Sequence, residues 1–153
     1  MESDKKNIAA LNSLLEINND RIEGYELAAK ETTDTDLKTL FSSMADESRN
    51  HRRELISEVI SQGGTPAEGT TTSGKVYRAW MDIKAAVTNK DRHAIISSCE
   101  GGEDAALNTY RDVMENDPPL NSKTLTLVNS QYAKIKASHD KIKAMRDMAE
   151  VKK

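Results

Sequence analysis

Apolar residues recur at steps of three and four along most of this 153-residue chain. That spacing places them on one face of an α-helix, because the helix has about 3.6 residues per turn. The pattern predicts long helices over about 4–30, 35–62, 91–116 and 122–149, with a connection over 63–90. The length suits one domain, 1–153, so we predict a single all-α domain.

The connections between the helices predict their arrangement. Short polar segments join the first helix to the second and the third to the fourth, so each pair should form an antiparallel hairpin. The connection over 63–90 is long and carries its own short helix around Trp80. One long crossover between two hairpins is typical of ferritin-like four-helix bundles, and this is the predicted fold.

Glycine and tryptophan in this pattern predict close packing. Gly63 and Gly64 should end the second helix, since glycine readily adopts a left-handed conformation. Gly101 and Gly102 fall inside the third long helix, at about 1 kcal/mol each relative to alanine. Such a pair is tolerable where another element packs against the backbone. Trp80 is expected to close one side of the bundle as core, with partner docking as the alternative.

Composition excludes several classes of function. The net charge is −3 with both signs interspersed, so no basic patch indicates nucleic-acid binding. The apolar runs are too short for a membrane span, and the N-terminus lacks the apolar segment of a signal peptide. The single cysteine, Cys99, is expected to be buried and inert. These features predict a cytoplasmic protein, with a homodimer or another protein as the open partner classes.

Polar residues interrupt the apolar faces of all four long helices. Glu103 precedes Tyr110 by seven positions, and Asn18 precedes Tyr25 by the same spacing. The helical rotation of about 100° per residue also places inward, or at the margin of the apolar face, the following residues: Glu47, Ser48, His51, Gln131 and His139. We predict a polar layer that includes Asn18, Tyr25, Ser48, Tyr110 and Gln131.

Two interpretations of this layer remain open. A carboxylate on an apolar face must be paired, protonated or metal-bound, and His51 and His139 could supply imidazole ligands. Glu103, His51, His139 and Glu47 then form a candidate metal site for Fe or Mn. Alternatively, Glu103 only hydrogen-bonds neighbouring side chains and fixes the register of the helices. In that case Glu103→Leu should be tolerated.

Five segments of the chain together resemble an uncharacterised bacterial family of ferritin-like four-helix-bundle proteins, described as a domain of unknown function. They are LNSLLEINNDRIEGYELAA at 11–29, GGTP at 63–66, GKVYRAW at 74–80, CEGGEDAALNTY at 99–110 and QYAKIKASHDKI at 131–142. The resemblance covers nearly the whole chain. It implies a ferritin-like fold in a cytoplasmic bacterial protein and no established activity.

Against ferritins and related di-iron proteins, the ligand pattern is reduced. Glu103 and Tyr110 match the Glu that precedes a Tyr by seven residues, but Asn18 stands where the equivalent carboxylate would precede Tyr25. In the second helix the nearest Glu–His pair, Glu47 and His51, is four residues apart instead of three. At most four of six ligands remain, so a full di-iron centre is not expected.

Three functions follow as hypotheses. The first is a non-catalytic or weakly metal-binding bundle with a stress-related role. The second is a metal-dependent oxidoreductase that uses Fe or Mn at the reduced site. The third is an interaction scaffold whose crossover, with Tyr77 and Trp80, docks a partner. No nucleophile elbow, phosphate-binding glycine loop or zinc-type cysteine pair is present, so no catalytic residue and no site for an organic cofactor is assigned.

Overall fold

The computed structural model describes residues 2–71, 74–89, 91–115 and 120–151, and the regular structure within them is entirely helical. The five helices are α1 (Glu2–Glu31), α2 (Thr35–Ser61), α3 (Gly74–Asn89), α4 (Arg92–Met114) and α5 (Ser122–Val151). The predicted bounds agree with these to within two residues. Position 116, where the third long helix was expected to end, lies outside the described residues.

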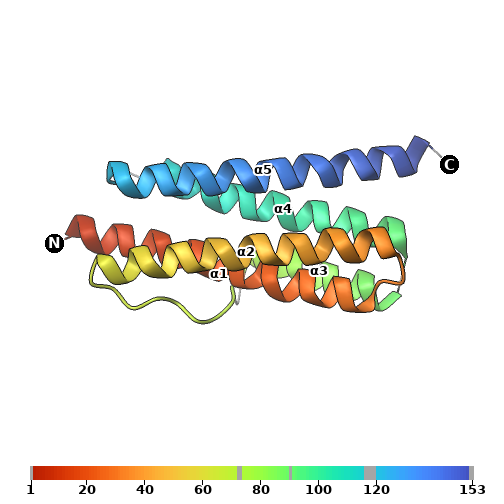
Figure 1. The fold of residues 1–153 in the computed structure, drawn as a ribbon, viewed down its shortest axis with the longest axis horizontal. Coiled ribbons are helices and arrows are strands. Elements are labelled where there is room, and N and C mark those ends of the chain that lie inside the picture. The colour runs from red at the N-terminus through yellow and green to blue at the C-terminus, as the bar shows by residue number, and fades with distance from the viewer. Residues whose placement is uncertain (1, 72–73, 90, 116–119, 152–153) are drawn as a thin grey trace.

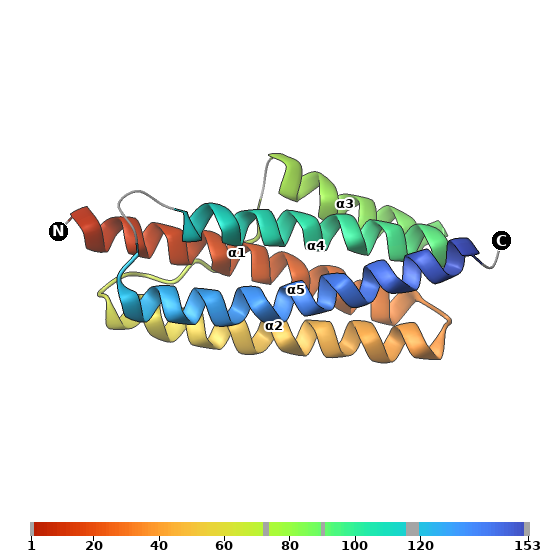
Figure 2. The same cartoon turned by 90° about the horizontal axis from the view of Figure 1, so that it is seen from above.

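The helices α1, α2, α4 and α5 lie along the long axis of the molecule (Figure 1). α1 and α5 run in one direction, and α2 and α4 run in the opposite direction (Figures 1 and 2). α1 packs mainly on α2, while α4 packs on α5 and α3. Because α2 and α4 run the same way, the segment between them must return the chain along the length of the molecule. The loop after α2 and then α3 make this return (Figure 2).

Polar side chains of α1 hold the loop that follows α2. The Asn12 amide donates to the carbonyl of Thr65 and accepts from the amide of Ala67, at 3.1 and 2.8 Å. Seven residues on, Asn19 donates to the carbonyl of Gly69 at 2.9 Å. The loop therefore follows the face of α1 on which these asparagines recur, and its backbone groups are paired there. Gly63 opens the loop with φ of 83°, the left-handed conformation expected of it.

The side chain of Trp80 packs α3 against α1 and α4. Its side chain is 4% exposed, as expected for a core residue. A Cβ added to Gly24 of α1 would lie 2.6 Å from the Trp80 ring, and one added to Gly102 of α4 would lie 3.3 Å from it. The ring also meets Tyr25 edge-on, with centroids 5.6 Å apart. The predicted close approach at the glycine pair is thus real at Gly102, where Trp80 packs against the backbone of α4.

Gly101 and Gly24 give a matched pair of substitutions. A Cβ on Gly101 meets nothing within 4 Å, so Gly101→Ala should raise the free energy of unfolding by about 0.5–1 kcal/mol through helix propensity. Gly24→Ala gains the same propensity but drives a methyl group into a rigid indole. Overpacking should make it destabilising by about 1–2 kcal/mol net. Urea unfolding of both variants measures whether their changes in unfolding free energy have opposite signs. A Gly24→Ala variant more stable than the wild type would contradict the close packing of Trp80 on Gly24.

None of the helices in the described part of the chain combines the length and apolarity needed to cross a membrane.

Candidate functional site

Arg21 is the largest fully buried side chain among the described residues, and it lies between α1, α2 and α4. Its Nε and Nη2 donate to the two carboxylate oxygens of Glu103, at 2.9 and 2.7 Å. Its Nη1 donates to Ser48 Oγ at 2.6 Å and lies 3.2 Å from Glu47 Oε1. We call Arg21, Glu47, Ser48 and Glu103 the arginine cluster. It joins three helices through one guanidinium.

The opposite charges within the arginine cluster stabilise one another. Burial alone would lower the pKa of Arg21, but the adjacent Glu103, together with Tyr25 and Glu47, outweighs burial and raises that pKa above its usual range. Arg21 and Glu103 are both 0% exposed. Glu47 is less enclosed, and its burial raises its carboxyl pKa although Arg21 opposes that shift. The guanidinium is therefore a permanent cation whose charge is balanced within the core.

A second polar network lies beside the arginine cluster. The Asn18 amide donates to the Tyr110 hydroxyl at 2.8 Å, and this hydroxyl donates to Gln131 Oε1 at 2.7 Å. Gln131 then donates to the carbonyl of His51 at 3.2 Å. The chain of hydrogen bonds connects α1, α4, α5 and α2. The five residues predicted for the polar layer are all buried, at 0–1% exposure: Asn18, Tyr25, Ser48, Tyr110 and Gln131.

His51 is buried with neither ring nitrogen hydrogen-bonded to a described residue. It lines a groove of about 340 Å³ between α2 and α5, together with Glu47 and Lys134. Burial, followed by the positive charges of Arg21 and Lys134, lowers the pKa of His51 from its usual 6.5 to about 3. The imidazole is therefore neutral in the folded protein near pH 7.

The depressed pKa of His51 predicts a pH-dependent contribution to stability. The unfolded chain binds a proton near pH 6.5, whereas the folded chain does not until about pH 3. The contribution of the neutral imidazole is complete above pH 6.5 and is lost as the pH falls toward 3. The difference in unfolding free energy between the wild type and His51→Gln should change by about 1.4 kcal/mol per pH unit in that window. Urea unfolding at pH 7, 6, 5 and 4 measures it, and a constant difference would contradict the shift.

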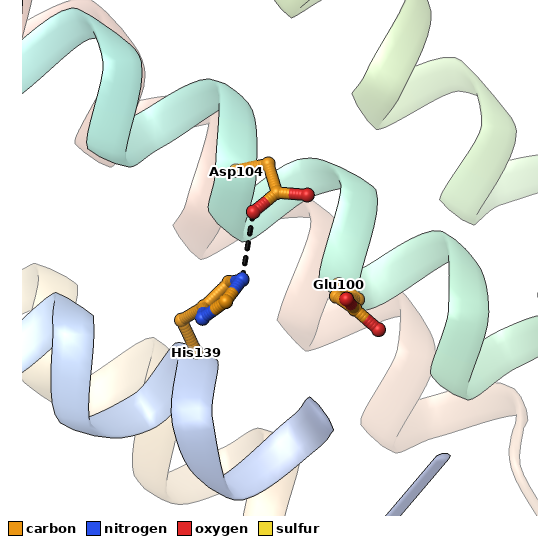
Figure 3. A group of neighbouring side chains, drawn as sticks. All are labelled: Glu100, Asp104 and His139. Atoms are coloured by element: carbon orange, nitrogen blue, oxygen red, sulfur yellow. Dashed lines mark ion pairs between the residues drawn. The ribbon is translucent and has the colours of Figure 1, made fainter. Parts of the chain in front are cut away.

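His139 lies at a different place from the arginine cluster, on the seam between α4 and α5 (Figure 3). Its Nε2 is 2.7 Å from Asp104 Oδ1, and its Nδ1 is 3.1 Å from Asp140 Oδ1. Glu100 lies one turn from Asp104 on α4. Among the described residues, Glu100, Asp104 and His139 are the group of three metal-ligating side chains whose ligand atoms all lie within 4.8 Å of one another.

The structure thus divides the predicted metal-site residues. It brings Glu103 and Glu47 together, but around a guanidinium. His51 faces the groove beside Glu47, and His139 pairs with Asp104 instead of joining them. Within the described residues, the predicted set of four does not form a group of mutually close ligand atoms. Metal binding by that set stays a prediction.

Sequence reasoning missed Arg21, Glu100 and Asp104. Arg21 stands three residues after Asn18 and four before Tyr25, so the spacing alone places it on the buried face of α1. The positive charge of Arg21 made burial unexpected. The negative charge of Glu103, which was predicted to face the core, indicated that a buried cation could pair with it. Glu100 and Asp104 are four apart on one face of α4, a spacing that brings both carboxylates toward α5.

Comparison with known proteins agrees with an uncharacterised family. No curated protein matches the chain at a significant level. One family model, described as a domain of unknown function (DUF2383), matches residues 6–116. That match begins in α1 and extends past the end of α4, so it includes Arg21, Ser48 and Glu103, and it stops before α5. The chain belongs to the DUF2383 family of domains of unknown function.

Proposed function

We propose that this chain is a non-catalytic, ferritin-like helical bundle in which a buried arginine takes the central position between inward carboxylates. The observation that carries the proposal is the two-point pairing of Arg21 with Glu103, both 0% exposed. A guanidinium that uses both oxygens of Glu103 and also contacts Glu47 supplies the positive charge these carboxylates require.

The ferritin-like assignment is supported by connectivity. Two hairpins, α1–α2 and α4–α5, are joined by a long connection, and α2 and α4 run in the same direction (Figure 1). That combination is the expected consequence of one crossover that traverses the length of a bundle. The spacing of Glu103 and Tyr110 adds a ferritin-type feature on α4.

The central residues do not fit the metal pair that such a fold implies. A di-iron or di-manganese centre needs inward Glu ligands from all four helices and two His ligands. Here the position on α1 is Asn18, whose amide donates to Tyr110, and Glu103 is committed to Arg21. A metal ion at Glu103 would have to displace a cation that makes two hydrogen bonds in a fully buried site. No catalytic step is therefore assigned to this position.

The experiment is an anaerobic Fe(II) titration of tag-free protein followed by exposure to oxygen, with Fe(III) formation followed by absorbance. We expect an oxidation rate equal to that of protein-free buffer, and the same rate in Glu103→Gln and His51→Gln. Oxidation that is faster in the wild type and lost in those two variants would contradict the proposal. His139→Gln is the control for iron held on the α4–α5 seam, because it leaves the arginine cluster untouched.

A further inference from the structure

We infer that Glu100, Asp104 and His139 form a binding site for a transition-metal dication of the Zn²⁺ type, on the seam between α4 and α5. The inference goes beyond the proposed function and shares no residue with the arginine cluster. It rests on the ligand atoms that two helices bring together at this seam (Figure 3).

The three side chains supply a suitable ligand set. One imidazole nitrogen and two carboxylate oxygens, with water in the fourth position, is a combination that Zn²⁺ accepts, whereas Mg²⁺ and Ca²⁺ prefer oxygen alone. Around a tetrahedral Zn²⁺ with bonds of about 2.1 Å, ligand atoms lie about 3.4 Å apart. The present separations are within 4.8 Å, and the His139–Asp104 contact is 2.7 Å. Side-chain movements of about 1 Å would bring these atoms to the spacing around a bound ion.

Asp140 orients the histidine ligand. Its Oδ1 lies 3.1 Å from His139 Nδ1, where it can accept a hydrogen bond from that nitrogen, and Nε2 lies 2.7 Å from Asp104 Oδ1. A carboxylate behind a ligating histidine is the usual arrangement in protein zinc sites, where it fixes both the ring and the tautomer.

Burial separates this group from an ordinary surface ion pair. The side chains of Glu100 and His139 are only 12% and 13% exposed, while Asp104 is 56% exposed. Glu100 and His139 are therefore held in place by packing, while the exposed Asp104 leaves the site open to an ion from solvent. α5 packs mainly on α4, so a bound ion would connect the two helices at the contact that holds α5 in place.

Arg146 of α5 contacts one of the three proposed ligands, Glu100. Its Nη1 lies 2.6 Å from Glu100 Oε2 and its Nη2 lies 3.1 Å from Asp147. A metal cation must share Glu100 with this guanidinium or displace it. Arg146 should therefore weaken metal binding, and Arg146→Gln should tighten it. This opposite effect is a signature that loss of folding cannot produce.

The test is a Zn²⁺ titration of chelator-dialysed, tag-free protein by calorimetry, repeated with Co²⁺ to record its visible absorption. We expect one Zn²⁺ per chain and a rise in Tm on adding Zn²⁺. His139→Gln and Asp104→Asn should abolish both, Asp140→Asn should weaken binding by about 10-fold, and Arg146→Gln should tighten it. His93→Gln, which removes another histidine of α4, should bind as the wild type does.

Two results would overturn the inference. One is the absence of saturable Zn²⁺ binding in both the wild type and Arg146→Gln. The other is binding to His139→Gln with the wild-type affinity, which would place the metal elsewhere. Circular dichroism and thermal unfolding without metal show whether each variant is folded. Mg²⁺ serves as the control cation and should produce no shift in Tm at equal concentration.

Discussion

Glu103→Leu is expected to lower the free energy of unfolding by about 3–5 kcal/mol. The substitution leaves the guanidinium of Arg21 fully buried with Glu47, Ser48 and the ring of Tyr25 as its remaining described partners. The loss is large because Glu103 is the fully buried carboxylate that pairs with both Nε and Nη2, whereas Glu47 is partly exposed and lies near Nη1 alone. This expectation is the opposite of the one that follows if Glu103 only hydrogen-bonds its neighbours, in which case leucine is tolerated. Urea unfolding at pH 7 measures the loss.

The control for this substitution is Glu23→Leu. Glu23 lies on the exposed face of α1, so the same change of side chain should alter stability by no more than about 0.5 kcal/mol. A small loss for both variants would mean that Arg21 does not depend on Glu103. Glu103→Gln should be intermediate, since an amide still accepts a hydrogen bond from Arg21 but carries no charge.

Trp80→Ala is the second substitution expected to have a large effect, at about 3–5 kcal/mol. The indole lies against the backbones of α1 and α4 at Gly24 and Gly102 and contacts Tyr25. Its removal leaves a cavity that the neighbouring glycines cannot fill. The expected result is a lower unfolding free energy together with faster hydrogen exchange in α3, measured by mass spectrometry.

Two further variants distinguish the packing of Trp80 against α1 and α4 from a general effect of substitutions in α3. Tyr77, on the same helix, is 43% exposed, so Tyr77→Ala should change stability by less than about 0.5 kcal/mol. In a Trp80→Ala background, Gly24→Ala should become stabilising, because the ring that opposes the new methyl group is gone. A Gly24→Ala penalty that persists without Trp80 would contradict the packing described here.

Much of the fold could be predicted from the periodicity of apolar residues. Stripes with steps of three and four defined each helix, and short or long connections defined which helices pair. Gly101 and Gly102 indicated a close approach to α4, but periodicity could not say which of the two faces the neighbour. Only the rotation of α4 against α3 decides that Gly102 meets Trp80 while Gly101 faces open space.

The candidate site was less predictable, because local spacing does not give the partner of a charge. Glu103 was expected on the inward face, and the residue that neutralises it lies 82 positions away at Arg21. The position of His139 around its helix predicted that its side chain faces the core. In the structure it pairs with Asp104 at the edge of the α4–α5 contact. Glu103 and Asp104 are neighbours on α4, yet Glu103 faces the arginine cluster and Asp104 faces the seam with α5.

Arg21 neutralises Glu103 in the core of the bundle, and a double-mutant cycle on chelator-treated protein tests this pairing most directly. Arg21→Met, Glu103→Leu and the double variant are unfolded in urea after dialysis against a chelator. We expect the double variant to lose far less stability than the sum of the losses in the single variants, with a coupling energy of about 2 kcal/mol or more. Additivity within about 0.5 kcal/mol would contradict it, because the two side chains would then act independently.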